Sequence, residues 1–256
     1  MSFLGKKTRL QRIFSHPSGK ILSVAIDHLI NYPIGMPEGL KDMDKCMASL
    51  IAGEPSAITM NKGIAKHYMK DYAGKVPLII QQVAVKSDDQ YFTDHASVEE
   101  VVALGADAIA VSICLKGATE AQQLGHLAKV VADAEPFGLP VIPHIYPLGS
   151  EGEENIVSHL SEDIFYAVRV GIEMGADVVK VPFTGDADSF RDIVSLSPIP
   201  IVAAGGPKCE DLNDTIKMVR EISKSGASGA TIGRNIWGFQ NPTKAIQQLK
   251  EAMYST

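Results

Sequence analysis

A helix-to-strand junction recurs along the chain, and it restricts the possible folds more than any other feature of the sequence. Three copies are nearly alike: "LGADAIAV" from Leu104, "MGADVVKV" from Met174 and "SGASGATI" from Ser225. In each copy a glycine closes a segment of helical periodicity, as a helix C-terminus favours, and an apolar run begins at once. Gly53 closes a fourth helix in the same way. A repeated helix–strand unit predicts a parallel α/β sheet.

Eight short apolar runs follow this arrangement, and most of them are rich in Val, Ile and Ala. They cover residues 21–28, 56–63, 76–82, 106–115, 139–147, 176–184, 199–206 and 227–235. Runs of this kind, bounded by turn residues, are typical of the buried strands of a parallel sheet. Segments with helical periodicity separate most of them, at residues 38–53, 97–105, 120–138, 161–175, 188–196, 209–226 and 242–255.

Eight β–α units in 256 residues predict an α/β fold of the (β/α)8 TIM barrel type, formed by residues 1–256 as one domain. A doubly wound open sheet has a similar pattern and is the alternative. The barrel is favoured because the eight strands occupy the chain without leaving a second domain. The longest polar interruption, residues 85–96, is predicted to be a surface insertion.

Charge and cysteine usage narrow the partners and the location of the protein. A net charge of −6 gives no support for nucleic acid or a membrane surface as partner, so an anionic ligand would need a local site. The three cysteines are far apart and show neither metal spacing nor a disulfide framework. The N-terminal segment lacks the apolar stretch of a signal peptide, and no run approaches the about 18 apolar residues of a spanning helix. We therefore expect a soluble, cytoplasmic protein.

One cationic residue lies inside a run that is otherwise apolar. Lys180 occupies the middle of "VVKVPF", residues 178–183. An isolated ammonium group in a protein interior is costly unless it is paired or loses its proton. Burial among Val and Phe lowers the pKa of a lysine, and the neutral amine can then attack a carbonyl. Lys180 is therefore predicted to be a Schiff-base nucleophile.

Other roles for Lys180 and other nucleophiles remain open at this point. Lys180 could point outward to a helix carboxylate, or form a structural ion pair inside the barrel. Lys62 and Lys116 also lie near predicted strand ends and compete for the nucleophile role. Both are closer to loops, where the pKa of a lysine is depressed less, so burial favours Lys180.

Amine chemistry also needs groups that move protons, and TIM barrels place reactive groups at the C-terminal ends of the strands. Tyr146 and Asp27 lie at two such ends. Tyr146 is a candidate for proton transfer, with a packing role as the alternative, and Asp27 is a candidate for holding a hydroxyl or the protonated amine. Strand alternation puts His28 opposite Asp27 and away from the lumen. Both His28 and His144 are expected to be structural.

Glycine pairs follow the last two predicted strands. Gly205 and Gly206 end the seventh, and Gly233 with Arg234 ends the eighth. Backbone N–H groups can approach a phosphate closely where no Cβ obstructs them, and an arginine adds a charge-assisted contact. These four residues are predicted to bind a substrate phosphate, whereas the alternative is that the glycines only allow tight turns.

The histidine pattern gives no sign of a metal site. The sequence contains no H-x-H or H-x-x-x-H pair, so zinc-dependent aldol chemistry is not favoured. We expect neither a metal nor another cofactor. The seven histidines are His16, His28, His67, His95, His126, His144 and His159.

Several short motifs together resemble one enzyme family. They are "AIDH", "KGI", "YP-x-G", "GADVVKVPFTGD", "AAGGPK" and "GRNIW", and they occur in order between Arg12 and Trp237. In this order they are similar to the archaeal-type class I fructose-bisphosphate aldolases of the DhnA/DeoC superfamily. Relatives of that family include the 2-amino-3,7-dideoxy-heptulosonate synthases and the autoinducer-2 phosphate thiolase. The segments "RIFSHPSGK" and "DSFRDIV" most resemble the heptulosonate synthases.

The resemblance implies a role for each candidate residue. Lys180 would form the imine with a phosphorylated ketone, Tyr146 would transfer protons, and Asp27 would contact the reacting hydroxyl. The two glycine turns and Arg234 would hold a substrate phosphate. Members of the family are commonly homo-oligomers of ten subunits, built from two pentameric rings.

The chain also departs from the pattern of that family. Where many members have "DHG" and "YPRG", this chain has Leu29 and Leu148, and Gln122 stands roughly where fructose-bisphosphate members have a lysine. Two cationic positions that would suit a second phosphate are thus neutral, although Lys116 could compensate. Phe183 replaces the family tyrosine near the lysine, so a more apolar lysine pocket is expected.

Three hypotheses about function follow. The first is a class I aldolase that cleaves or forms a carbon–carbon bond in a phosphorylated ketose and releases a ketone like dihydroxyacetone phosphate. The second is a transaldolase-like heptulosonate synthase or a thiolase-like acyl transfer. The third is a barrel that binds sugar phosphate without catalysis. Borohydride trapping of an imine separates the enzymes from the binder.

Overall fold

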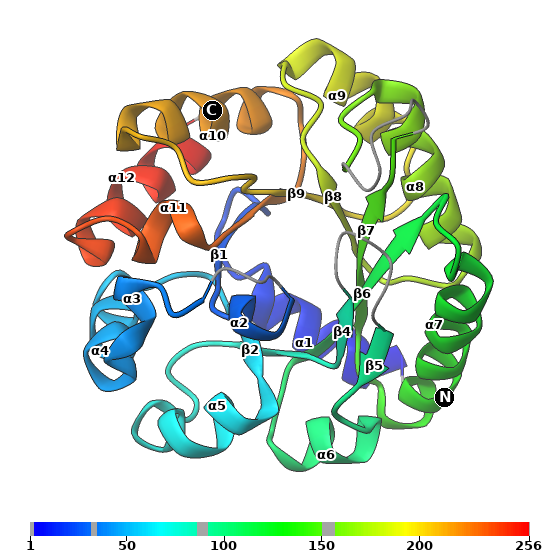
Figure 1. Ribbon diagram of the computed structural model, residues 1–256, viewed down its shortest axis with the longest axis horizontal. Helices are drawn as coiled ribbons and strands as arrows, with labels where there is room; N and C mark the ends of the chain where they lie inside the picture. The colour runs from blue at the N-terminus through cyan, green and yellow to red at the C-terminus, as the bar shows by residue number, and fades with distance from the viewer. Residues whose placement is uncertain (1–2, 32–34, 86–91, 150–156, 256) are drawn as a thin grey trace.

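The computed structural model describes residues 3–31, 35–85, 92–149 and 157–255. Eight parallel strands close into a barrel in the order β1-β10-β9-β8-β7-β6-β3-β2 (Figure 1). Each of the eight predicted runs contains one strand, so the (β/α)8 barrel is confirmed and the open doubly wound sheet is wrong. The strands are β1 Ile21–Ala25, β2 Ile58–Asn61, β3 Leu78–Gln81, β6 Ala108–Leu115, β7 Val141–Pro147, β8 Val179–Pro182, β9 Ile201–Ala204 and β10 Gly229–Ile232.

Helices lie around the outside of the barrel and alternate with the strands (Figure 1). No helix in the described ranges is long and apolar enough to cross a membrane. The longer helices are α4 Met43–Ala52, α5 Lys62–Tyr68, α6 Val98–Ala103, α7 Glu120–Ala134, α8 Ser161–Glu173, α9 Ala187–Ser195, α10 Leu212–Lys224 and α12 Pro242–Tyr254. Short helices are α2 His28–Asn31, α3 Glu38–Lys41, α11 Arg234–Trp237 and the 3-10 turns Lys70–Tyr72 and Glu135–Phe137.

Several helical segments differ from the sequence-based prediction, and helix α1, Phe3–Ile13, is one that it did not include. The segment 38–53 divides into α3 and α4 because Asp42 caps α4, accepting a hydrogen bond of 3.0 Å from the Lys45 amide. Helix α5 follows β2 directly and was not predicted, since its seven residues are too few to show a periodic pattern.

The junction glycines do not all serve the same purpose. Gly105, Gly175 and Gly226 have φ angles of 72°, 84° and 84°, the left-handed conformation expected after a helix. Gly53 instead has a φ of −80°, and the next residue, Glu54, is left-handed with a φ of 53°. A Cβ on Gly53 would come within 2.7 Å of the side chain of Ile246 in α12, so this glycine allows close helix packing.

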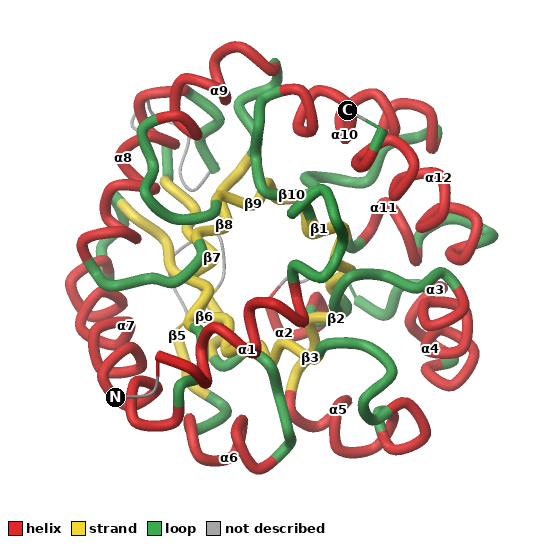
Figure 2. The backbone as a smooth tube through the Cα atoms, turned by 180° about the vertical axis from the view of Figure 1, so that it is seen from behind, coloured by secondary structure: helices red, strands yellow, loops and turns green. Residues whose placement is uncertain are grey.

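Strand alternation gives the barrel an apolar N-terminal half. One side-chain cluster fills the lumen there, and helix α1, Phe3–Ile13, lies across this end of the barrel (Figure 2). Ile13 is fully buried in the cluster, with Leu10 and Phe14 packed against it. The N-terminal segment therefore closes one end of the barrel. The other members of the cluster are Ile21, Ala57, Ile79, Ala108, Ala110, Ile142, Val178 and Val202.

The polar stretch predicted as an insertion contains a small sheet. Strands β4, Val83–Val85, and β5, Phe92–Asp94, pair antiparallel outside the barrel order. Residues 86–91 between them lie outside the described residues. The described part of this stretch is therefore a strand pair rather than an irregular loop.

Candidate active site

Polar side chains replace the apolar ones toward the C-terminal ends of the strands. Because side chains alternate along a strand, residues two and four positions beyond the apolar cluster also face the lumen. On β7 this places His144 and Tyr146 above Ile142, and on β8 it places Lys180 above Val178. The lumen thus changes from hydrocarbon at one end to titratable groups at the other. Other polar residues on the same face are Ser23, Asp27, Thr59, Asn61, Gln81, Ser112 and Thr231.

Lys180 is buried inside the barrel and does not point outward to a helix. Its side chain is nearly inaccessible, with 6% of the residue exposed. Burial lowers the pKa of its amine to about 8, and the Asp27 carboxylate opposes this shift only in part. At pH 7 roughly a tenth of such an amine is neutral, against fewer than about one in a thousand for an ordinary lysine.

The two competing lysines have different surroundings. Lys62 is 39% exposed and forms an ion pair of 2.7 Å with Glu100 of α6. Lys116 is 36% exposed and is paired with Asp163 of α8. Both amines thus have a carboxylate partner and are partly exposed, whereas burial lowers the pKa of Lys180.

His144 was expected to have a structural role, and the structure places it beside Lys180. It is paired in register with Lys180 on the neighbouring strand, so the two side chains leave the sheet side by side and enter the lumen. Burial and the charge of Lys180 lower the pKa of His144 well below its ordinary value, so the imidazole is neutral. The sequence indicates the face on which His144 lies, since Ile142, His144 and Tyr146 alternate along the strand, but not its pairing with Lys180.

Tyr146 and Asp27 lie nearer the C-terminal end of the barrel. Tyr146 follows His144 by two residues, is partly exposed, and is paired in register with Cys114. Asp27 follows β1 and is 6% exposed. Its charge influences the pKa of Lys180, which places the two groups in one electrostatic environment.

His28 does not lie away from this region, and that part of the prediction is wrong. Its Nδ1 lies 3.5 Å from the carboxylate of Asp27, and its ring meets the ring of Trp237 edge to face at 5.2 Å. A Cβ on Gly233 would come within 2.2 Å of the His28 ring. Asp27 ends a strand and His28 begins α2, so alternation no longer applies at that point. Burial lowers the pKa of His28 to about 4, which keeps it neutral.

The two glycine turns come together through Arg234. Its guanidinium Nη2 donates a hydrogen bond of 3.0 Å to the carbonyl of Gly206. Gly206 has a φ of 65°, and a Cβ there would meet no atom within 4 Å, so space is open beside its backbone. An oxyanion could be held there by backbone N–H groups and the guanidinium together.

Gly205 has a different role from the one predicted for it. Its N–H donates 3.0 Å to the carbonyl of Thr231 within the barrel and is therefore not available to a phosphate. A Cβ on Gly205 would come within 3.1 Å of the Cα of Ile232, so this glycine lets β9 and β10 approach.

Asn235 joins the two turns. Its Nδ2 donates to the carbonyls of Gly205 and Pro207 at 3.0 and 2.8 Å, and its Oδ1 accepts from the amide of Cys209 at 2.7 Å. The asparagine of the "GRN" motif therefore holds the loops after β9 and β10 together, rather than facing a ligand.

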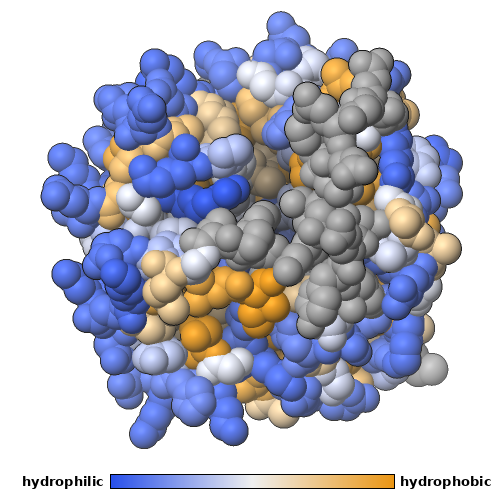
Figure 3. Space-filling view, in the orientation of Figure 1, coloured by the Kyte–Doolittle hydropathy of each residue, from blue (hydrophilic) through white to orange (hydrophobic). Residues whose placement is uncertain are grey.

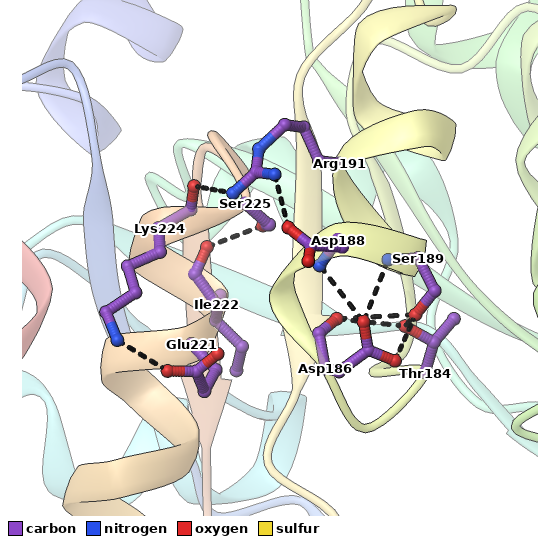
Figure 4. Close-up of polar contacts among 9 residues, drawn as sticks. All are labelled: Thr184, Asp186, Asp188, Ser189, Arg191, Glu221, Ile222, Lys224 and Ser225. Atoms are coloured by element: carbon purple, nitrogen blue, oxygen red, sulfur yellow. Dashed lines mark hydrogen bonds and ion pairs between the residues drawn. The ribbon is translucent and has the colours of Figure 1, made fainter.

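The "TGD" part of the lysine-bearing motif forms a helix cap. Asp186 accepts hydrogen bonds of 3.0 and 2.9 Å from the amides of Asp188 and Ser189 at the start of α9 (Figure 4). Thr184 adds a contact of 2.8 Å to the Ser189 hydroxyl. Further along α9, Arg191 is paired with Asp188 and donates to the carbonyl of Lys224 in α10. This motif thus fixes the chain that follows the strand of Lys180.

The positions that depart from the family pattern remain uncharged in the structure. Leu148 is buried against Cys114, and Gln122 is exposed on α7. Lys116 cannot supply the missing charge freely, because Asp163 neutralises it. On the face of the C-terminal strand ends, hydrophobic residues gather over α2, where Leu29 is 38% exposed (Figure 3). In the described ranges no three His, Cys, Asp or Glu residues are grouped as metal ligands.

Comparisons of the sequence with known proteins agree on one family. The model described as DeoC/LacD family aldolase matches residues 21–238. The fructose-bisphosphate aldolase class 1 of Thermoproteus tenax is 31% identical over 251 residues, which cover 95% of this chain and 92% of that protein. The 2-amino-3,7-dideoxy-D-threo-hept-6-ulosonate synthase 1 of Archaeoglobus fulgidus is 30% identical, covering 96% of this chain and 90% of that protein.

Solved structures with the same architecture include two of archaeal aldolases. An archaeal fructose 1,6-bisphosphate aldolase superposes with a TM-score of 0.87 at 29% identity, over 98% of this chain and 100% of that one. A second archaeal aldolase, whose catalytic lysine is covalently bound to the carbinolamine intermediate of its substrate, gives a TM-score of 0.86 at 28% identity. That match covers 97% of this chain and 99% of the other.

Proposed function

Because the chain belongs to the DeoC/LacD family of aldolases, we propose that it is a class I aldolase acting on a phosphorylated ketose through an imine on Lys180. The observation that carries this proposal is the lysine itself, buried in the lumen with a pKa lowered to about 8. The similarity to an aldolase with a carbinolamine on its lysine supports the same chemistry here.

The first step is imine formation. The neutral Nζ of Lys180 adds to the carbonyl carbon of the substrate, and loss of water from the carbinolamine gives a protonated imine. His144, held beside Lys180 and neutral, can hydrogen-bond the amine or the carbinolamine hydroxyl without repelling the positive charge of the imine. Asp27 stabilises that positive charge electrostatically.

The second step is cleavage of the carbon–carbon bond. A base takes the proton of the C4 hydroxyl, the C3–C4 bond breaks, and its electron pair enters the imine to form an enamine while the aldehyde leaves. The same group then returns a proton to C3, and hydrolysis of the imine releases the ketone and Lys180. We assign this proton transfer to Tyr146, since it faces the lumen beyond His144 and is partly exposed.

The substrate phosphate is assigned to the turns after β9 and β10. Gly206 leaves open space beside its backbone and Arg234 supplies charge, whereas the missing Cβ of Gly233 makes room for the His28 ring. Gly205 contributes only by letting the two strands approach each other.

A heptulosonate synthase is the second candidate function. The relative of that name at 30% identity supports it, and so do the neutral side chains of Leu148 and Gln122, which do not suit a second phosphate. Fructose 1-phosphate and fructose 1,6-bisphosphate should therefore be compared as substrates for cleavage. A preference for the monophosphate supports this candidate, whereas efficient cleavage of the bisphosphate contradicts it.

The proposed chemistry is tested by trapping the imine. The protein is incubated with dihydroxyacetone phosphate and sodium borohydride, and the modified peptide is identified by mass spectrometry. An adduct on Lys180 is expected. An adduct on Lys62 or Lys116 would contradict the assignment, and binding without an adduct would favour a barrel that binds sugar phosphate without catalysis.

We further propose that the barrel is a single domain, works in the cytoplasm without nucleic acid or membrane partners, and assembles into a homo-oligomer, with ten subunits as the resemblance implies. Exposed apolar side chains on α8 and just before it, Leu160, Phe165 and Tyr166, support an interface between subunits. Light scattering coupled to size-exclusion chromatography measures the mass of the assembly. A monomer at micromolar concentration would contradict the oligomer.

A further inference from the structure

Two buried amide oxygens in the lumen have no hydrogen-bond donor in the described part of the chain. Asn61 ends β2 and Gln81 ends β3, and the two are paired in register, so their side chains lie next to each other on the lumen face. Asn61 is 9% exposed and Gln81 is fully buried. Neither Asn61 Oδ1 nor Gln81 Oε1 has a partner among the described residues.

The neighbouring groups show which atom of each amide is the oxygen and which is the nitrogen. Gln81 contacts the carbonyl of Val83 at 2.7 Å, and a carbonyl can only accept, so the amide nitrogen of Gln81 must face it. The same nitrogen lies 3.0 Å from the hydroxyl of Ser112. Asn61 likewise directs its nitrogen to the carbonyl of Asp27 at 3.5 Å. Both oxygens are therefore acceptors that face away from these contacts.

Buried acceptors of this kind are rare in proteins, because each unpaired polar atom destabilises the folded state. Two of them on adjacent strands, beside Asp27, indicate a place that a ligand completes. In the closed barrel β2 lies four strands from β8 in either direction, so Asn61 is across the lumen from Lys180. A substrate attached to Lys180 would extend its remote carbons toward this pair.

We propose that Asn61 and Gln81 form a subsite that binds the hydroxyl groups of the aldehyde half of the substrate. This inference rests on the proposed aldolase function. Two acceptors require a ligand with two donors, which neighbouring hydroxyl groups supply. An ammonium group suits the subsite less well, because both acceptors are neutral amide oxygens rather than carboxylates. The subsite therefore selects a polyhydroxy aldehyde over an unsubstituted one.

The test compares aldehydes in the direction of bond formation. Dihydroxyacetone phosphate is the ketone, and glyceraldehyde is compared with propanal, which has the same chain length but neither hydroxyl. The wild-type protein should prefer glyceraldehyde in kcat/KM by about tenfold or more, as expected when buried polar groups are left unpaired by the poorer substrate. Asn61→Leu and Gln81→Leu should each lower this preference severalfold, chiefly through KM for glyceraldehyde.

Thr231→Val is the matched control. It also removes a polar atom from the lumen, but that hydroxyl is already satisfied by Ser23 at 2.6 Å, so the preference for glyceraldehyde should persist. Asn61→Leu loses only a contact of 3.5 Å and should fold, which a melting temperature equal to or above that of the wild type would show.

Borohydride trapping on Lys180 separates this inference from the proposed function. If the variants form the adduct and keep the wild-type preference, the two oxygens bind only water and the subsite is wrong. If wild type instead prefers 3-aminopropanal to both other aldehydes, the ligand class is wrong. If the wild type forms no adduct with dihydroxyacetone phosphate, the aldolase proposal itself fails, and the subsite falls with it.

Discussion

At the scale of single residues, burial of the Lys180 amine both destabilises the folded protein and makes the amine more reactive. Lys180 lies where the lumen changes from apolar to polar, above Val178 and beside His144. Desolvation makes its ammonium form unfavourable, and the same desolvation supplies the neutral amine that the proposed imine chemistry requires. Lys62 and Lys116 each have a carboxylate partner and are partly exposed. Their amines are therefore not desolvated in the way that the Lys180 amine is.

Replacing Lys180 by methionine should stabilise the protein while abolishing adduct formation. The difference between the ordinary pKa of 10.5 and the lowered value of about 8 corresponds to about 3 kcal/mol. Because the folded-state pKa is the lower one, this cost is fully present below pH 8 and disappears as the pH rises toward 10.5. Urea unfolding of Lys180→Met at pH 7 should therefore show a gain of up to about 3 kcal/mol, which shrinks at pH 10. If the difference in free energy of unfolding between Lys180→Met and the wild type were the same at both pH values, the amine would not be desolvated.

Tyr146→Phe should impair proton transfer, whereas Lys180→Met should prevent imine formation. The ring and its packing remain, but the hydroxyl that transfers the proton is lost, so turnover should fall by about 10²–10⁴-fold. The adduct with dihydroxyacetone phosphate should still form, because imine formation depends on the lysine. Turnover close to that of the wild type would leave Tyr146 with a packing role and make Asp27, or a water that it holds, the acid–base group.

At the scale of elements, side-chain hydrogen bonds fix the loops that follow β8, β9 and β10. Asp186 caps α9 immediately after the strand of Lys180, and Asn235 joins the turns after β9 and β10. Helix α1 closes the opposite end, where Ile13 fills the apolar half of the lumen. Binding and stability are therefore separated along the barrel axis, as in other TIM barrels.

Arg234→Ala should weaken the binding of a phosphorylated ketone by about 1.5–3 kcal/mol, the range for a hydrogen bond to a charged group. The guanidinium lies beside Gly206, where space for an oxyanion is open. Calorimetric titration with dihydroxyacetone phosphate measures the loss, and unphosphorylated dihydroxyacetone is the comparison. An unchanged preference between the two ketones would place the phosphate elsewhere.

Ile13→Ala should destabilise the barrel without changing the chemistry of the site. Ile13 is fully buried against Ile21 and the other apolar residues of the lumen, so its truncation leaves a cavity. Substitutions of this kind cost about 2–5 kcal/mol. Urea unfolding measures the loss, and KM for the ketone should stay unchanged at a temperature where the variant is folded. A loss below about 1 kcal/mol would mean that α1 is not part of the core.

At the scale of the whole molecule, the buried histidines link stability to acidity. His28 and His144 are both neutral in the folded state because burial lowers their pKa values, that of His28 to about 4. The unfolded chain takes up protons at these residues below about pH 6.5, whereas the folded chain does not. Their contribution to stability is therefore fully present above pH 6.5 and is lost as the pH falls toward 4.

The free energy of unfolding should thus decrease steadily between pH 6.5 and about 4. His144→Gln removes one of the two buried imidazoles and leaves that of His28. The decrease in the free energy of unfolding should therefore be shallower, and the position of Lys180 should not change. Urea unfolding at half-unit pH steps gives both slopes. Identical slopes for His144→Gln and the wild type would show that His144 is already accessible to protons.

Local features of the sequence are enough to predict the barrel, its eight strands and the buried lysine. Local signals carry these features: turn glycines, apolar runs and one cation inside a run, as at Lys180. The candidate residues Asp27, Tyr146, Gly206 and Arg234 also follow from it, since residues at strand ends in a barrel share one end.

The relative placement of neighbouring strands depends instead on tertiary contacts. The register that sets His144 beside Lys180, and Asn61 beside Gln81, depends on hydrogen bonds between segments far apart in the chain. The hydrogen bond from the Gly205 amide to Thr231, which removes Gly205 from the proposed phosphate site, is of the same kind. Strand register is fixed by packing across the whole barrel, so no local pattern of residues could show these contacts.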